Sequence, residues 1–305
     1  MNKNTRMRWV EIRVDADPAS VDDLVSLLGR HCQGGAVVES HPDASTEEER
    51  RRITVKGFLP VWDEDTRQKL EIALLLLQRV SPISEPRISI LEPEDWAESW
   101  KAHFSPQHIG ERTVIVPTWH EYQRASGEVV INLDPGMAFG TGLHATTRLC
   151  LEAIERYLRQ EMAVLDVGTG SGILAISAAL QGAMHVRGID VDAVAVEVAR
   201  ENVALNQVEH IVAIERATLG NDAPPDVPQH AGTQYDLVLV NILAETIMKM
   251  LPSLVASLRV GGIMVGSGIL LEKAGAVTAS LKDAGMTLLE QMQQDGWVAL
   301  VAERS

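Results

Sequence analysis

The sequence predicts an α/β protein of two domains, in which a small α+β unit precedes a larger domain built on a mostly parallel sheet. Three observations lead to this fold class. From Ala163 onward, strand patterns alternate with helical patterns of about ten to fifteen residues, as a parallel sheet requires. The chain closes with two strand patterns joined at Asp295-Gly296, a strong hairpin signal. Its first ninety or so residues follow the order βαββαβ.

Alternating apolar residues predict four strands in the first domain, which we place at residues 1–92. The strands are expected at 9–14, 36–39, 52–58 and 87–91, with one helix around Leu24 and Leu28 and a second from Asp63 to Val80. This order of elements predicts a ferredoxin-like fold, and such a fold indicates little about function by itself.

A linker helix is expected at 93–106, between the two domains. Its Trp96, Trp100 and Phe104 recur at every fourth position, which places the three rings on one face of the helix. A buried packing stripe explains this spacing better than a binding surface does.

The second domain, at 107–305, begins with two strands, Thr113–Trp119 and Glu128–Leu133, that are expected to form a β-hairpin. Five parallel strands follow, and the closing hairpin adds two antiparallel ones, so the sheet is expected to have seven strands. They are expected at Ala163–Val167, Val186–Asp190, Ile211–Glu215, Leu237–Asn241, Ile263–Gly266, Met286–Gln294 and Trp297–Ala302.

Composition indicates an ordinary globular protein, with 46% apolar and 23% charged residues. Two widely separated cysteines exclude a disulfide scaffold, and the polar start without a long apolar run predicts a cytoplasmic protein with no signal peptide and no membrane partner. The net charge of −15 disfavours direct nucleic-acid readout and suits a basic protein partner, although solubility explains it equally well.

The stretch from Asp166 to Gly172 is expected to bind a cofactor, because it follows a strand and opens a helix. Its glycines, Gly168, Gly170 and Gly172, permit a tight turn and a close approach of the backbone to a ligand. A dinucleotide fingerprint needs a further glycine where Ile173 stands. The pattern D-x-G-x-G-x-G instead fits S-adenosylmethionine, with Asp166 serving the cationic amino end of its methionine. A tight turn without a ligand is the alternative.

Two acids follow the next strand. Asp190 ends that strand, and a carboxylate there accepts hydrogen bonds from the two ribose hydroxyls of a nucleoside. We assign the ribose to Asp190 and the capping of the following helix to Asp192. An acid at this point suits a nicotinamide cofactor equally well.

Asn241 lies at the end of the fourth parallel strand, where ligands bind in open α/β sheets. Its side-chain oxygen is predicted to accept a hydrogen bond from a substrate amine, although a helix cap is a common alternative. Three positions after Asn241 stands Ala244 rather than an aromatic residue, which argues against a nucleobase substrate.

Upstream, Phe139 belongs to a glycine-containing loop that is expected to close over the cofactor, whereas His144 is interpreted as structural. The nine histidines show no metal-ligand spacing, so no metal is expected.

Several of these motifs together resemble one family. The run Asp134–Gly142, then His144 and Thr146-Thr147, then the glycine turn and Asn241–Ala244, resembles the PrmA family, the bacterial methyltransferases of ribosomal protein L11. The resemblance covers nearly the whole chain. It departs from the family at Leu143, Ala145 and Thr169, where many members have Thr, Pro and Cys.

The resemblance implies a Rossmann-like class I methyltransferase domain and a front domain that recognises the ribosomal protein. It implies trimethylation of the α-amine and of lysine side chains, with Thr147, Gly168, Asp190 and Asn241 among the cofactor contacts. Three alternatives remain open: a class I methyltransferase with another protein or small-molecule substrate, a nicotinamide-dependent oxidoreductase, and a non-catalytic ribosome-binding module.

Overall fold

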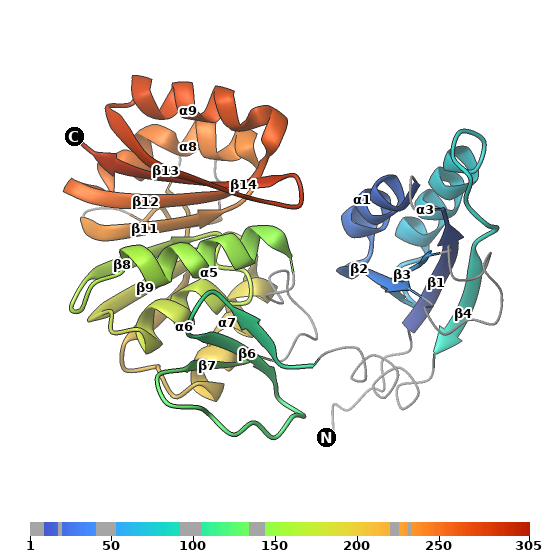
Figure 1. The fold of residues 1–305 in the computed structure, drawn as a ribbon, viewed down its shortest axis with the longest axis horizontal. Helices are drawn as coiled ribbons and strands as arrows, with labels where there is room; N and C mark the ends of the chain where they lie inside the picture. The colour runs from blue at the N-terminus through green and yellow to red at the C-terminus, as the bar shows by residue number, and fades with distance from the viewer. Residues whose placement is uncertain are drawn as a thin grey trace. The chain divides into compact units, whose positions relative to one another are not determined.

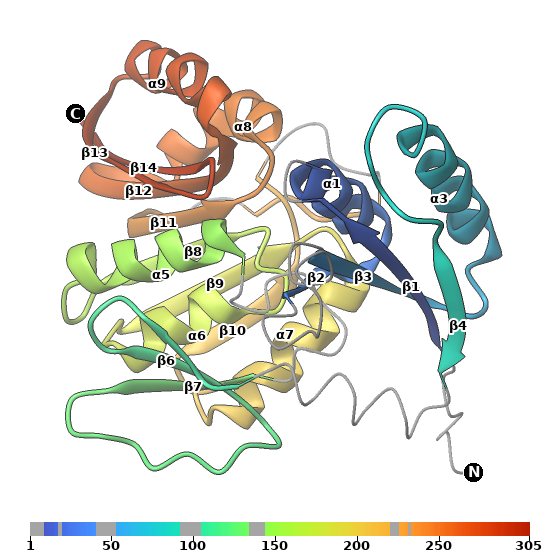
Figure 2. The same cartoon turned by 45° about the vertical axis from the view of Figure 1, so that its right-hand side comes forward.

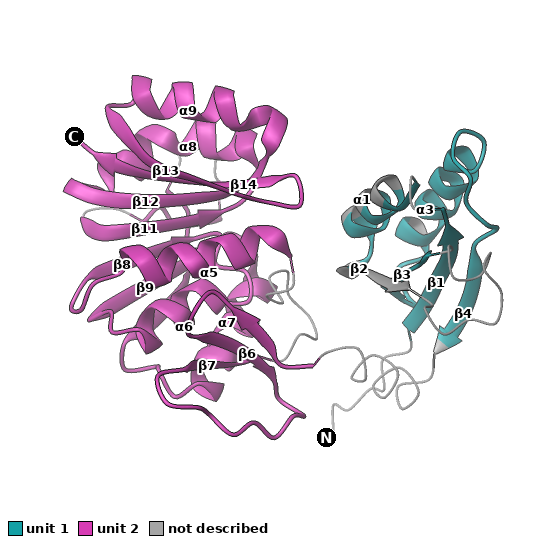
Figure 3. Ribbon diagram, in the orientation of Figure 1, with its two compact units in different colours: residues 1–104 teal, residues 105–305 magenta. Residues whose placement is uncertain are grey.

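The computed structural model describes residues 9–17, 20–40, 53–91, 105–133, 144–219, 226–230 and 233–305 (Figure 1). The chain divides into two compact units, residues 1–104 and residues 105–305 (Figure 3). Of the predicted linker helix at 93–106, only residues 105 and 106 lie within the described ranges, and neither is helical. Phe139 also lies outside the described residues.

The first unit has the element order predicted from the sequence. Its elements are β1 (Trp9–Ala16), α1 (Val21–His31), β2 (Gln33–Ser40), β3 (Ile53–Pro60), α3 (Glu64–Leu77) and β4 (Arg87–Leu91). The strands form one sheet in the order β2-β3-β1-β4, and every neighbouring pair is antiparallel. Alternate residues of β1, Val10, Ile12 and Val14, are buried against Leu24 and Leu70 of the two helices, because side chains alternate between the faces of a strand.

The second unit contains the predicted seven-stranded sheet, in the order β10-β9-β8-β11-β12-β14-β13. The first five strands in that order are parallel, and β14 runs antiparallel to both β12 and β13, so the closing hairpin is confirmed. The strands are β8 (Ala163–Val167), β9 (His185–Asp190), β10 (Val212–Arg216), β11 (Tyr235–Asn241), β12 (Leu258–Leu270), β13 (Met286–Gln294) and β14 (Trp297–Arg304).

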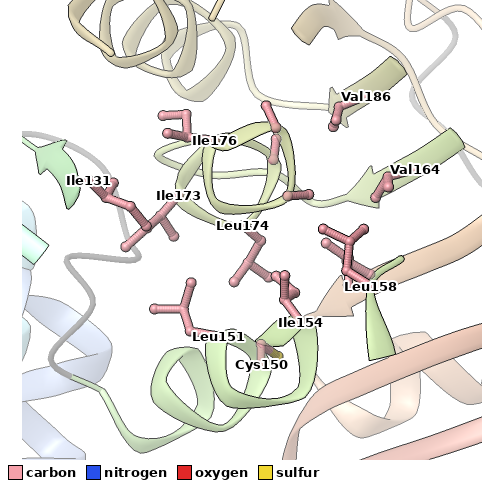
Figure 4. Packing of buried hydrophobic residues seen from close by; sticks show 14 of the residues in the cluster. Ile131, Cys150, Leu151, Ile154, Leu158, Val164, Ile173, Leu174, Ile176 and Val186 are labelled. Atoms are coloured by element: carbon pink, nitrogen blue, oxygen red, sulfur yellow. The ribbon is translucent and has the colours of Figure 1, made fainter. Parts of the chain in front are cut away.

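Helices cover both faces of this sheet (Figures 1 and 2). On one face lie α5 (Ala145–Tyr157), α6 (Ile173–Leu180) and α7 (Ala193–Leu205), and on the other lie α8 (Ala244–Ala256) and α9 (Ala274–Asp283). Consecutive residues of β8 show the division, since Val164 packs with the first group and Leu165 with the second. Figure 4 shows Val164 together with Cys150 and Ile154 of α5 and Leu174 of α6 in one buried cluster. Burial on both faces explains why the parallel strands are apolar throughout.

A small third sheet corrects one prediction. Its strands are β5 (Gln107–Ile109), β6 (Thr113–Pro117) and β7 (Val129–Leu133), in the order β5-β6-β7. The expected hairpin of β6 with β7 is wrong, because these two strands are parallel, with Thr113 opposite Val129. The long connection after β6 brings the chain back, so that β7 begins beside the start of β6. The hairpin partner of β6 is β5, and the turn between these two strands contains Gly110, with φ 62°. None of the described helices is long and apolar enough to cross a membrane.

Candidate active site

The turn between β8 and α6 adopts the backbone that its three glycines were predicted to allow. Gly168, Gly170 and Gly172 have φ of 71°, 55° and 82°, in the left-handed region. A side chain there costs about 1–2 kcal/mol per residue. At Gly168 a Cβ would also lie 2.6 Å from Cγ2 of Ile242, after β11. The turn therefore needs glycine for its shape and for its close contact with the neighbouring strand.

Backbone and side-chain hydrogen bonds fix this turn. The N–H groups of Gly168 and Thr169 both donate to the carbonyl of Ile189, at 2.9 and 3.0 Å. From α7, the buried Asn202 donates through Nδ2 to the carbonyl of Ser171 at 2.9 Å. The sequence interpretation missed Asn202. The feature that could have identified it is a polar residue on the buried face of the helix, next to Ala199. The turn between β8 and α6 is thus held by β9 and α7, the next strand and helix along the chain.

Asp166 lies beneath the turn, with 1% of its surface exposed. Its Oδ2 accepts a hydrogen bond of 2.7 Å from the hydroxyl of Thr169, one of the positions that departs from the family. Its Oδ1 has no hydrogen-bond partner within the described part of the chain. Burial raises the pKa of Asp166 to about 7 and the charge of Asp190 adds to this, whereas Thr169 and the N–H of Ala175 oppose it.

This pKa predicts an unusual pH dependence of stability. The pKa of Asp166 is about 7 in the folded chain against an ordinary value of 3.8 for an unfolded one, so the folded chain binds the proton more tightly. The resulting stability is present in full below pH 3.8 and is lost as the pH rises from there through 7. From pH 5 to pH 8 the loss attributable to Asp166 is roughly 2–3 kcal/mol. Asp166→Asn lacks a titrating group and is expected to lose that much less, as measured by urea unfolding at both pH values. Equal losses in the two proteins would contradict the assignment.

Asp190 ends β9 and is hydrogen-bonded to the turn. Its Oδ2 accepts from the N–H of Gly170 and its Oδ1 accepts from the N–H of Asp192, both at 3.0 Å. Because an ionised carboxylate has about four acceptor positions, two remain for a ligand. Asp192 accepts from the N–H of Val194 at 2.9 Å as the N-cap of α7, which confirms its predicted capping role.

Asn241 ends β11, and its Nδ2 lies 3.5 Å from the hydroxyl of Thr147 in the first turn of α5. Thr147 is almost fully buried, with 1% of its surface exposed.

His144 is the N-cap of α5 and accepts from the N–H of Thr146, as its structural interpretation predicted. Burial lowers the pKa of His144, which favours the neutral ring that a capping acceptor requires. The ring of Trp297, at the start of β14, lies edge-on to it at 4.9 Å between centroids, so the closing hairpin reaches this edge of the sheet.

Gly268 permits a close backbone contact that the sequence interpretation missed. It has φ 82°, and a Cβ there would lie 2.1 Å from the carbonyl oxygen of Ile242. The pairing of β12 with β14 shifts between Gly266 and Ile269, so Gly268 lies in an irregularity of its strand. A glycine inside a strand pattern is the signal for such a close backbone approach. It lets β12 pass directly against the residue that follows Asn241.

The predicted site residues in the described chain thus gather at one edge of the sheet. The ends of β8, β9 and β11 are adjacent there, because the strand order places β8 between the other two. The described residues contain no group of three or more side chains suited to a metal ion. A cavity of about 550 Å³ lies beside β10 and is lined by Arg187, Arg200 and Arg216, but not by Asp166 or Asp190. It is therefore separate from this site.

Comparison with known proteins identifies the family. A sequence model of the family described as ribosomal protein L11 methyltransferase (PrmA) matches residues 8–305. The chain belongs to this family. Two relatives named ribosomal protein L11 methyltransferase, from Chloroflexus aurantiacus and Symbiobacterium thermophilum, are each 40% identical over 97% of this chain and cover 98% and 99% of their own lengths. The resemblance found in the motifs is therefore confirmed.

A solved structure gives the same result for the PrmA family. The crystal structure of ribosomal protein L11 methylase from Lactobacillus delbrueckii subsp. bulgaricus is 33% identical, with a TM-score of 0.59. The match covers 66% of this chain and all of that one. Together with the seven-stranded sheet and its antiparallel hairpin, this confirms the Rossmann-like class I methyltransferase fold that was predicted.

Proposed function

We propose that this chain is an S-adenosylmethionine-dependent N-methyltransferase that methylates the α-amine and lysine side chains of ribosomal protein L11 in the cytoplasm. The observation that carries the proposal is the pairing of two acids, Asp166 and Asp190, at one glycine turn, in a member of the PrmA family. Residues 107–305 would bind the methyl donor, and residues 1–92 would recognise the protein. The net charge of −15 suits a basic protein substrate better than a nucleic acid.

The residues of the turn fit a cationic nucleoside. The two unused acceptor positions of Asp190 match the two hydroxyls of a ribose. The buried Oδ1 of Asp166, which lacks a partner among the described residues, matches a cationic amino group. A pyrophosphate would instead be repelled by the carboxylate of Asp166, which together with Ile173 disfavours a nicotinamide dinucleotide. Bound at this turn, S-adenosylmethionine supplies a methyl group already activated by its sulfonium.

The protein's own contribution is to position an amine. Asn241 directs Nδ2 toward Thr147, which leaves its Oδ1 to accept a hydrogen bond from the substrate amine. The amine must lose its proton first: with a pKa near 10.4 a lysine needs about 4.6 kcal/mol at pH 7, and an α-amine near 8 needs about 1.4. The α-amine is therefore the easier target, and a lysine needs desolvation. Since Asn241 cannot take up a proton, the proton is lost to water before attack.

Removing this acceptor is expected to lower turnover. In Asn241→Ala, kcat should fall by about tenfold or more, because one hydrogen bond that orients the attacking amine is lost. Thr147→Val, which removes the partner of Nδ2 but keeps the acceptor, should lose less. Turnover of Asn241→Ala within about threefold of the unaltered chain would exclude a transition-state role worth about 0.7 kcal/mol.

One incubation separates this function from the alternatives. The full chain is mixed with S-adenosylmethionine labelled at its methyl group and with purified ribosomal proteins, and the labelled residues are mapped by mass spectrometry. Label on amines of ribosomal protein L11 is expected. Label on other proteins alone indicates a different protein substrate. A lack of transfer to any protein, with the donor bound, favours a small-molecule substrate or a binding module.

A further inference from the structure

The carboxyl group of Asp166 is buried beneath the turn and is only half satisfied. One oxygen accepts from Thr169 at 2.7 Å, and the other has no hydrogen bond of normal geometry among the described residues, although the N–H of Ala175 is close enough to lower the pKa of the carboxyl group. We propose that Asp166 couples ligand binding to proton release: the site holds the ammonium end of its ligand with Asp166 ionised, and binds it weakly while Asp166 carries a proton. This inference rests on the proposed function, since it concerns the same ligand.

Among the residues that the structure describes, no positive side chain balances the charge of Asp166. From β9, Asp190 faces it with a like charge. From α5, Cys150 faces it as a fully buried thiol whose own pKa is raised by burial and by Asp166, so it is neutral. Ser267 of β12 is hydrogen-bonded to that thiol. From α6 comes only the N–H of Ala175. Within the described chain, the positive charge for Asp166 must therefore come from the ligand.

Linkage gives the direction and size of the effect. The free protein has Asp166 about half protonated at neutral pH, because its pKa is about 7. A bound ammonium favours the ionised carboxylate, so the pKa is lower in the complex than in the free protein. The affinity for the ligand is therefore highest above pH 7. Below pH 7 it decreases, and the decrease approaches tenfold for each pH unit. Between pH 7.5 and pH 6 the Kd is expected to rise about eightfold.

Two small ligands separate the ammonium from the rest of the molecule. S-adenosylhomocysteine carries the nucleoside, the thioether and the amino-acid end, whereas 5′-methylthioadenosine carries the first two without the ammonium. If Asp166 responds to the ammonium, the Kd of S-adenosylhomocysteine changes about eightfold over this range, and that of 5′-methylthioadenosine stays within about twofold.

The test is calorimetry with the full chain at pH 6, 7 and 7.5, in buffers of different ionisation enthalpy, so that proton release is measured with affinity. S-adenosylhomocysteine is expected to release close to one proton at pH 6 and progressively less at pH 7 and pH 7.5. Asp166→Asn should bind with a Kd independent of pH and release none. The control Asp283→Asn, which removes an exposed carboxylate on α9, should behave like the unaltered chain.

Proton release by Asp166→Asn equal to that of the unaltered chain would overturn the proposal, as would equal release with 5′-methylthioadenosine. If Asp166→Asn does not fold, Thr169→Val serves instead. Loss of its hydroxyl raises the pKa of Asp166 further, so the midpoint of the affinity curve must move to higher pH. An unmoved midpoint contradicts the proposal. Absence of binding by S-adenosylhomocysteine at every pH would instead contradict the proposed function.

Discussion

Asp190→Ala is expected to weaken the binding of S-adenosylmethionine by about 100-fold or more while the chain remains folded. The substitution removes the two acceptor positions assigned to the ribose hydroxyls. Each hydrogen bond to a charged group contributes about 1.5–3 kcal/mol, and a loss of about 3 kcal/mol corresponds to about 100-fold in Kd. It also removes the acceptor of the Gly170 N–H, so the turn loses one of its hydrogen bonds to β9, while those from Gly168 and Thr169 to Ile189 remain. Isothermal calorimetry measures the Kd, and circular dichroism verifies the fold.

Asp192→Ala is the matched control, because it removes the same group two residues away. Asp192 caps α7 and accepts from Val194, so its loss should cost about 1 kcal/mol of stability. Its Kd for the donor should stay within about twofold of the unaltered value. If Asp190→Ala binds as tightly as Asp192→Ala, the assignment of the ribose to Asp190 is wrong.

Gly268→Ala is expected to lower the free energy of unfolding by roughly 3 kcal/mol or more. Two effects combine at this position. The backbone has φ 82°, and the new Cβ would lie 2.1 Å from the carbonyl oxygen of Ile242, a backbone atom that cannot rotate away. Either β12 or the end of β11 must move, so Asn241 should be displaced and turnover should fall too. Guanidinium unfolding gives the first quantity and methyl transfer the second.

Gly127→Ala separates backbone strain from the steric clash. Gly127 has φ 88°, but a Cβ there meets nothing within 4 Å. Its substitution should therefore cost only the strain of about 1–2 kcal/mol and leave methyl transfer unchanged. If the two variants lose the same stability, contact with Ile242 does not matter, and the positioning role of Gly268 is refuted.

The parts of the site that the sequence predicted are those whose chemistry is local. Three glycines between a strand pattern and a helix pattern permit a turn with positive φ, and the structure has positive φ at all three. Asp190 and Asn241 were predicted because the carboxyl ends of parallel strands lie at one edge of a sheet. The observed order β9-β8-β11 brings these ends together. The capping role of Asp192 was also local, since it spans two residues.

The parts that were missed depend on contacts distant in the sequence. Gly268 matters because of Ile242 on the neighbouring strand, and Asn202 because of Ser171 in the turn. Asp166 is buried because α5 packs over it, and no local sequence pattern indicates that contact. The parallel pairing of β6 with β7 was missed for the same reason, because strand patterns do not specify direction.

Titration of the purified chain with two cofactors in a calorimeter decides whether this turn holds a sulfonium nucleoside. S-adenosylmethionine is expected to bind at one site per chain, and a nicotinamide dinucleotide is expected to give no heat of binding at the same concentrations. Saturable binding of the dinucleotide, together with no measurable affinity for S-adenosylmethionine or S-adenosylhomocysteine, would contradict the assignment of this turn to a sulfonium nucleoside.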